Sequence, residues 1–179
     1  MKKGISGCAA FCLLILSTTM GVAGAASSGW GRVNMQGAVI ETACAIDTQS
    51  RDQTIDMSVL PLSQIMRDGQ GTTQPFSIHL VNCVLGRFDS RQPDWQRFQV
   101  TFDGRADNGL FMVEGQARGV ALQIADTSGN IASPGEPLPA VAITEGSKKL
   151  NYSLRLMGNK QVLRAGDYTS TLRFKMNYY

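Results

Sequence analysis

Apolar and polar residues alternate with a period of two in five segments of the chain. These segments cover residues 76–80, 98–102, 120–124, 150–156 and 172–178. Because successive side chains of a β-strand point to opposite faces, this period is typical of strands with one face on a core and the other in water. The pattern therefore predicts five strands, and it makes the shorter segments 33–41 and 54–59 further strand candidates.

Turn-forming residues separate the alternating segments, as at Asn108-Gly109 and Ser133-Pro134-Gly135. Helical periodicity is weak, and only residues 60–66 are expected to form a turn or two of helix. Short strands at this spacing, with no internal repeat or long linker, predict an all-β sandwich of immunoglobulin type. The period alone leaves a jelly roll and an open barrel as alternatives.

The first 25 residues have the composition of a secretory signal peptide. Lys2 and Lys3 precede an apolar stretch at 9–16, and Ala23-Gly24-Ala25 fits the small-x-small rule for cleavage. The alternative is a membrane anchor, but the apolar stretch is shorter than the roughly 20 residues that span a bilayer. We therefore expect residues 1–25 to be removed and the mature chain to begin near Ala26.

Removal of this segment changes both the charge and the cysteine count. The whole chain has 17 Lys and Arg against 14 Asp and Glu, and loss of the two lysines leaves a nearly neutral chain. So small a net charge excludes nucleic-acid binding that works by phosphate neutralisation. Cys8 and Cys12 are also lost, whereas Cys44 and Cys83 remain. Two cysteines in an exported chain predict one disulfide.

No arrangement of residues points to catalysis. The single histidine, His79, lies on the polar face of a predicted strand, where a surface role is expected. The chain has no Gly-x-Ser-x-Gly motif, and oxidised cysteines cannot act as nucleophiles. Asp103, Asp107 and Asn108 cluster near a turn, but their spacing is not that of an EF-hand loop. We expect no enzyme activity, no metal, no cofactor and no small-molecule substrate.

The two ends of the mature chain favour an exchange of strands between molecules. The last alternating segment reaches the C-terminal residues without a following strand to cover it. The segment at 27–35 also has an extended pattern, with Gly31, Val33 and Met35 on one parity. A strand with a free edge at one end and an extended segment at the other are the two parts that β-augmentation needs.

Four motifs, taken in order, resemble those of pilus subunits of the chaperone–usher pathway in Gram-negative bacteria. Residues 37–46 (GAVIETACAI) resemble the first strand of these pilins, and residues 76–83 (FSIHLVNC) resemble the strand with the second disulfide cysteine. Residues 119–126 (GVALQIAD) resemble the central strand. Gly166, the alternating apolar residues after it and the penultimate Tyr178 resemble the C-terminal motif.

The resemblance implies an incomplete immunoglobulin-like sandwich that lacks its last strand and is completed by a donor strand. A periplasmic chaperone would fill the groove first, and the N-terminal extension of a neighbouring pilus subunit would replace it at the outer-membrane usher. Residues 26–37 would then be the donor extension, with Gly31, Val33 and Met35 entering the neighbour's groove, and residues 38–179 would be the pilin domain. The groove motif would comprise Gly166, Leu172, Phe174, Met176, Tyr178 and the terminal carboxylate of Tyr179.

By the same resemblance, the chain is expected to be a structural, minor subunit of an adhesive pilus, exported through the periplasm to the cell-surface fimbrium. The segment before Gly31 is short and polar apart from Trp30, which indicates a specialised donor. Residues 100–103, 115–119 and 129–132 are similar to those of the P-pilus terminator, whose groove accepts no further donor. A terminator is therefore the alternative role. A tip adhesin would resemble a two-domain protein with a separate lectin domain, for which residues 26–179 leave no room.

Overall fold

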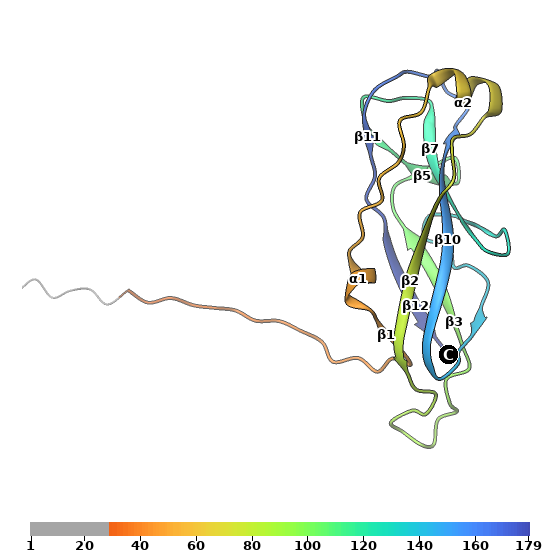
Figure 1. Ribbon diagram of the computed structural model, residues 1–179. Helices are drawn as coiled ribbons and strands as arrows, with labels where there is room; N and C mark the ends of the chain where they lie inside the picture. Colours follow the sequence, from red (N-terminus) through yellow and green to blue (C-terminus); the bar gives the residue numbers. More distant parts are fainter. Residues whose placement is uncertain (1–28) are drawn as a thin grey trace, which may run out of the picture. The chain divides into compact units, whose positions relative to one another are not determined.

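The computed structural model describes residues 29–179, which belong to two units of the chain. The first unit ends at Ala38, and its described residues, 29–38, form no helix or strand. The second unit, Val39–Tyr179, contains every helix and strand of the described part (Figure 1). The expected signal peptide at 1–25, and residues 26–28 of the expected donor extension, lie outside the described residues.

Strands dominate the second unit. Its helices are α1 (Thr48–Arg51) and α2 (Leu62–Asp68). Its strands are β1 (Ala45–Ile46), β2 (Gln74–Cys83), β3 (Arg97–Asp103), β4 (Ala106–Asp107), β5 (Leu110–Met112), β6 (Glu114–Gly115), β7 (Val120–Asp126), β8 (Ile131–Ala132), β9 (Val141–Ala142), β10 (Gly146–Gly158), β11 (Tyr168–Thr169) and β12 (Arg173–Tyr178). The five long strands β2, β3, β7, β10 and β12 confirm the five strands that the alternation predicts.

The strands form two larger antiparallel sheets and one small one. The first sheet has the order β1-β2-β10-β7-β5-β4, with β8 added at β7. The second has the order β12-β3-β9, and β11 pairs with β6. Neighbours such as β2 and β10 are far apart in the sequence, so the sheets hold the whole second unit together.

The core lies where the inner faces of the two larger sheets meet. Phe102 of β3 packs edge-on against Tyr152 of β10, with ring centroids 5.1 Å apart. Tyr152 stacks on Phe76 of β2 at 5.3 Å, so the contact joins strands of both sheets. Burial of apolar side chains such as these is the main source of stability, at about 25 cal/mol per Å² of apolar surface. The arrangement is a two-layer sandwich.

The helices follow local signals. The helix predicted at 60–66 is present as α2, which ends at Gly69 with a φ of 71° and an N–H that donates to the Ile65 carbonyl. Ile65 is buried, which fixes α2 on the sandwich. The sequence pattern did not predict α1, because four residues are too few to show a helical period. Its N-cap is Asp47, whose carboxylate accepts a hydrogen bond from the Gln49 N–H.

Two predicted strands are wrong. Residues 33–41 and 54–59 form no strand in the structure. Their apolar residues alternate as expected, but a strand also requires backbone hydrogen bonds to a neighbouring strand, and the described chain supplies no such backbone pairing to these segments. Val33 and Met35 are exposed, whereas Ile55 and Met57 are half-buried against the core.

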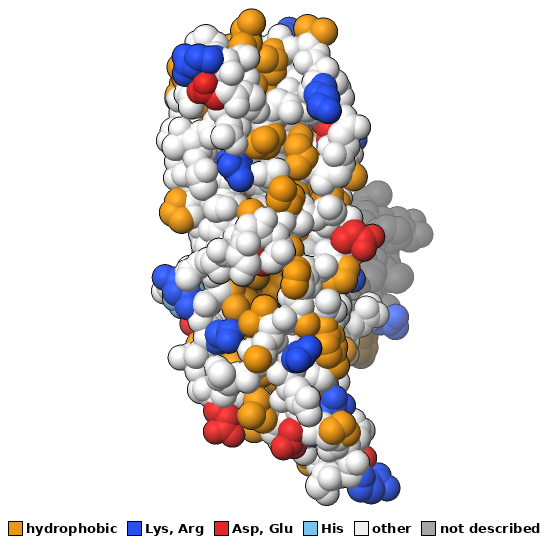
Figure 2. Space-filling view, turned by 90° about the vertical axis from the view of Figure 1, so that its right-hand side faces the viewer, with side chains coloured by type: hydrophobic (Ala, Val, Ile, Leu, Met, Phe, Trp, Pro, Cys, Tyr) orange, Lys and Arg blue, Asp and Glu red, His pale blue; other side chains and the backbone are white. Residues whose placement is uncertain are grey.

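The surface has no large area of one charge on the face that Figure 2 shows. Apolar side chains form a broken band along this face, and basic and acidic groups are scattered on both sides of it. Among residues 29–179, no helix is long and apolar enough to cross a membrane. This face is therefore better suited to apolar contacts with another molecule than to long-range electrostatic attraction of a charged one.

Candidate functional site

A long apolar groove of about 1060 Å³ runs along the second unit. One lip is residues 50–60, from the end of α1 into the segment before α2, and the other is residues 164–174, which include β11 and the start of β12. Figure 1 shows both segments on the same side of the sandwich. Core side chains form the floor: Ile78, Phe102, Leu122, Ile124, Leu154 and Leu156. The groove therefore gives access to the interior between the two sheets.

Both lips have backbone edges that no strand among residues 29–179 covers. β12 pairs with β3 on one side and is the outermost strand of its sheet. The opposite lip, at 54–59, is in no sheet of the described chain. Since backbone N–H and C=O groups need hydrogen-bond partners, two uncovered edges with a gap between them can accept one extended strand.

The side chains of β12 divide by parity. Leu172, just before the strand, and Phe174, Met176 and Tyr178 within it are half-buried and pack on the core. Arg173, Lys175 and Asn177 point to solvent. Phe174 approaches Phe102 with ring centroids 6.4 Å apart, which connects the lip to the floor. The groove motif predicted from the sequence is therefore an apolar row that faces inward.

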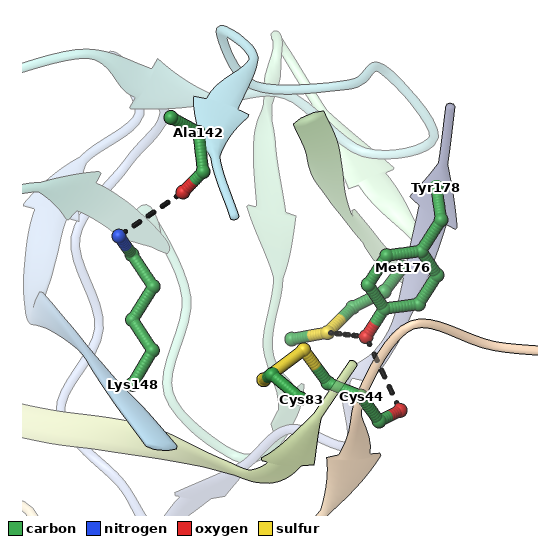
Figure 3. The surroundings of a disulfide bond; sticks show 6 residues. All are labelled: Cys44, Cys83, Ala142, Lys148, Met176 and Tyr178. Carbon is green, nitrogen blue, oxygen red and sulfur yellow. Dashed lines mark hydrogen bonds between the residues drawn. A yellow bond between two sulfur atoms is a disulfide. The ribbon is translucent and has the colours of Figure 1, made fainter. Parts of the chain in front are cut away.

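One end of the groove is closed by aromatic packing near the disulfide. Leu172 and Phe174 line the groove, but Met176 and Tyr178 do not. Tyr178 lies 6.0 Å, centroid to centroid, from both Trp95 and Phe98. Its hydroxyl lies 3.5 Å from the Cys44 carbonyl oxygen and 3.4 Å from the Met176 sulfur (Figure 3). Burial raises the pKa of the Tyr178 hydroxyl.

The expected disulfide between Cys44 and Cys83 is present. It joins the segment before β1 to the end of β2, and both cysteines are buried. Figure 3 shows the disulfide beside Met176 and Tyr178. The bridge therefore fastens the N-terminal edge of the sandwich next to its C-terminal strand.

At the other end of the groove, two backbone segments lie close together. A Cβ atom at Gly166 would meet the Gln116 Cβ at 2.6 Å and the Ala117 nitrogen at 2.8 Å. The Gln116 and Ala117 N–H groups both donate to the Asp167 carbonyl. Gly166 thus lines the groove and lets residues 164–168 lie directly against 114–118. This is a structural reason for a glycine at the position that the motif singled out.

The charges at the groove rim are balanced. Three arginines and three aspartates line it: Arg51, Asp52, Asp56, Arg164, Asp167 and Arg173. Among residues 29–179 there is no group of three or more His, Cys, Asp or Glu that could hold a metal ion. The rim therefore offers neither a strong anion site nor a strong cation site, and the groove is suited to an apolar, extended occupant.

The predicted donor residues lie in the first unit. Trp30, Val33 and Met35 are 96%, 85% and 90% exposed. A Cβ atom added at Gly31 would meet no other atom within 4 Å. The side chains of Trp30, Val33 and Met35 are therefore not packed against other residues of the described chain.

The sequence pattern did not predict that residues 54–59 form a lip of the groove. The segment 54–59 alternates, and this signal led to the prediction of a paired strand instead of an uncovered edge. It also missed the contribution of Trp95, whose half-buried ring closes the groove end against Tyr178. A single tryptophan in a loop carries no periodic signal that would have identified it.

The fold and the groove define a class of protein, an all-β sandwich that is open along one side. Comparison with known families agrees with this class. The family model described as "Fimbrial protein" matches residues 33–179. The chain therefore belongs to the fimbrial protein family, whose members are structural pilin subunits and not enzymes.

Individual relatives are fimbrial proteins of enteric bacteria. The PRS fimbrial minor pilin protein of Escherichia coli is 36% identical over 150 residues, which cover 83% of this chain and 77% of that protein. The major MR/P fimbria protein of Proteus mirabilis is 27% identical over 164 residues, covering 91% of this chain and 92% of that protein. Both comparisons extend over nearly the whole chain.

A solved structure gives the same fold. The P pilus rod subunit PapA superposes with a TM-score of 0.69 at 21% identity, over 77% of this chain and all of that one. At this identity the likeness concerns the fold alone. The chain is thus an all-β, immunoglobulin-like pilin, as the sequence predicted.

Proposed function

We propose that this chain is a structural, minor subunit of an adhesive pilus and is joined to its neighbours by donor-strand complementation and exchange. The observation that supports this most is the groove between two uncovered backbone edges, in a chain that also carries an unpaired apolar segment outside its sandwich. A strand from another molecule would cover both edges at once and fill the opening to the core.

The residues of the donor extension fit such a role. Residues 26–37 place Gly31, Val33 and Met35 on one parity, so these three residues would face the neighbour's groove. Burial of Val33 and Met35 would contribute about 1.5–3 kcal/mol each, in addition to main-chain hydrogen bonds. Gly31 would occupy a shallow part of the groove.

The same groove would be occupied by a periplasmic chaperone before assembly. Leu172, Phe174, Met176, Tyr178 and Gly166 would border the chaperone's strand, and the carboxylate of Tyr179 would be held by its basic residues. An outer-membrane usher would then catalyse replacement of the chaperone by a neighbouring subunit. The route requires export through the periplasm, directed by residues 1–25, and ends at the cell surface.

Deletion of residues 26–37 tests the donor role. The shortened chain should fold, bind its chaperone and remain unattached to a preceding subunit, because its groove is intact and its donor is absent. Incorporation is measured by purifying fimbriae and detecting the chain in them. Incorporation of the deletion variant at the normal level would contradict the proposal.

A thermal melt tests the groove itself and separates the structural role from the terminator alternative. With the oxidised chain lacking residues 26–37, addition of a synthetic peptide from a pilin N-terminal extension should raise the melting temperature of a structural subunit. No rise from a chain that is stable only with its chaperone would favour a terminator. The 36% identity to the PRS and PAP fimbrial minor pilin proteins supports the minor role and does not by itself distinguish the two. A chain already stable alone, with no rise, would contradict strand exchange altogether. Specific binding to a glycan array would instead favour an adhesin.

A further inference from the structure

The loop between β2 and β3, residues 84–96, is held in a defined conformation. The Arg87 guanidinium lies over the Trp95 ring at 3.5 Å and donates to the Gln92 side chain at 2.6 Å. The Trp95 N–H donates to the Leu85 carbonyl at 2.8 Å. Trp95 also packs on Tyr178, so the loop is built on the closed end of the groove.

This ordered loop holds an aromatic side chain in water. Phe88 is 98% exposed, although its own N–H donates to the Glu41 carboxylate at 2.6 Å. That bond places Phe88 beside the segment that enters the sandwich, where Val39 and Ile40 are also exposed. Val84, likewise exposed, donates its N–H to the Ala43 carbonyl. We call Val39, Ile40, Val84 and Phe88 the terminal apolar patch.

A patch of this kind has the properties of a binding anchor. Large aromatic side chains dominate the binding energy of protein interfaces, and an ordered loop loses little conformational freedom when its tip is buried. Isolated exposed apolar residues need no explanation, but these four lie on two segments that are joined by the Phe88–Glu41 and Val84–Ala43 hydrogen bonds. Asp89, Glu41 and Arg91 flank the patch and would form a polar rim.

The position of the patch in the chain identifies its partner. Gly37 ends the donor extension, and Val39 begins the second unit two residues later. An extended chain advances at most about 3.6 Å per residue, so Ile40 is within about 11 Å of Gly37 in any conformation. Whatever molecule holds residues 26–37 therefore lies close to Val39 and Ile40, and the bond from Phe88 to Glu41 places Phe88 beside them.

We infer that the terminal apolar patch docks, through Phe88, on the same pilus subunit whose groove accepts residues 26–37. The inference rests on the proposed function and adds a second contact to it, made by the folded domain instead of the extension. The donor strand alone would leave the two sandwiches connected by a flexible link, whereas a docked Phe88 would set their relative orientation.

Photo-crosslinking in assembled fimbriae tests this contact. A benzophenone amino acid is placed at position 88, at position 33 in the donor extension, or at position 162, and the crosslinked partner is identified by mass spectrometry. Val162 is a matched control, since it is 88% exposed and follows the Gly158 end of β10, away from the Gly146 end that pairs with Cys83. Positions 88 and 33 should give the same partner subunit, and position 162 should not.

The outcomes separate the inference from the proposed function. If position 33 crosslinks to a pilin and position 88 gives no crosslink or a different partner, the docking inference is wrong and strand exchange stands. If position 33 reaches no pilin, the proposed function itself fails.

A second measurement uses ordinary variants. Phe88→Ser should shorten the half-life of the joined subunits in a fixed concentration of guanidinium chloride by at least about tenfold, as loss of an interface anchor does. Val162→Ser should leave the half-life unchanged. Equal half-lives for the two variants would overturn the inference, and both side chains are exposed enough for the variants to fold.

Discussion

At the scale of single residues, Gly166 shows why a small side chain is needed where two loops touch. Its position allows residues 164–168 to lie against 114–118. Both segments meet at the end of the groove that is opposite Tyr178. The contacts are to the Gln116 Cβ and to backbone atoms of Gln116 and Ala117, none of which can move aside as the far end of a flexible side chain can. A methyl group there must displace one loop from the other.

Gly166→Ala should therefore lower the free energy of unfolding by about 1–3 kcal/mol, the usual cost of overpacking. The matched control is Gly86→Ala, because a Cβ atom at Gly86 would meet nothing within 4 Å. Denaturant unfolding of the two variants beside the parent chain measures the difference. Equal stabilities would show that the two loops separate at little cost.

Tyr152 gives a second prediction at this scale, for alkaline pH. Burial, and then the charge of Asp126, raise the pKa of its hydroxyl above the ordinary value of 10. Because the folded state holds the proton more tightly than the unfolded state, the contribution to stability is complete below about pH 10 and is lost as the pH rises above it.

We expect the parent chain to lose stability more steeply than Tyr152→Phe between pH 10 and pH 12. Denaturant midpoints measured across this range give the comparison, and Tyr179→Phe, at a half-exposed position, is the control. Identical slopes for the parent and Tyr152→Phe would mean that this hydroxyl does not titrate on unfolding.

At the scale of elements, the parity of the donor extension should decide its function. Val33 and Asn34 are neighbours, yet only Val33 shares a face with Gly31 and Met35. Val33→Asp would put a charge into an apolar groove, which is costly without a partner, while Asn34→Asp would leave the same charge in water. Fimbriae should contain the Asn34→Asp chain at the normal level and lack the Val33→Asp chain. Equal incorporation would show that parity is irrelevant.

The elements also show what the sequence could predict. The long strands alternate in sequence, so their existence followed from the pattern alone, although β7 is buried on both faces. The signal for α2 was weaker, and the prediction at 60–66 differs from its bounds by two residues. The segments at 33–41 and 54–59 have the same alternation, but they lack a neighbour within the described chain. Alternation shows that a segment suits a sheet and gives no information about where its partner comes from. For that reason the residues that misled the strand assignment lie in the proposed donor extension and in one lip of the groove.

Other parts of the site had no periodic signal. Trp95 and Phe88 lie in a loop, and their contacts depend on how residues 84–96 fold on Tyr178 and Glu41. Gly166 was singled out by its place in a motif, but its contact with Gln116 needs the paired loops to be seen. Such contacts join residues far apart in the sequence, which no local pattern records.

At the scale of the whole molecule, charge has little part in recognition. The groove rim holds three arginines and three aspartates. Binding of a donor peptide should therefore change by less than about threefold between 0.05 and 0.5 M salt, since screening acts on net attraction between charges. Peptide titrations at the two salt concentrations measure this. A large loss of affinity at high salt would show that electrostatic attraction brings the strand to the groove.

The groove and the donor extension are unlike parts in separate units of one chain, and this has a consequence for the size of what they build. A contact between unlike surfaces does not close on itself in a pair, so it generates an open chain of molecules. Under the proposed function, each subunit is a monomer with two different reactive ends, as in a step-growth polymer. The length of such a polymer depends on how many monomers have only one working end. Chains without residues 26–37, which can accept a strand and cannot donate one, would then lower the mean length of the polymers that contain this subunit.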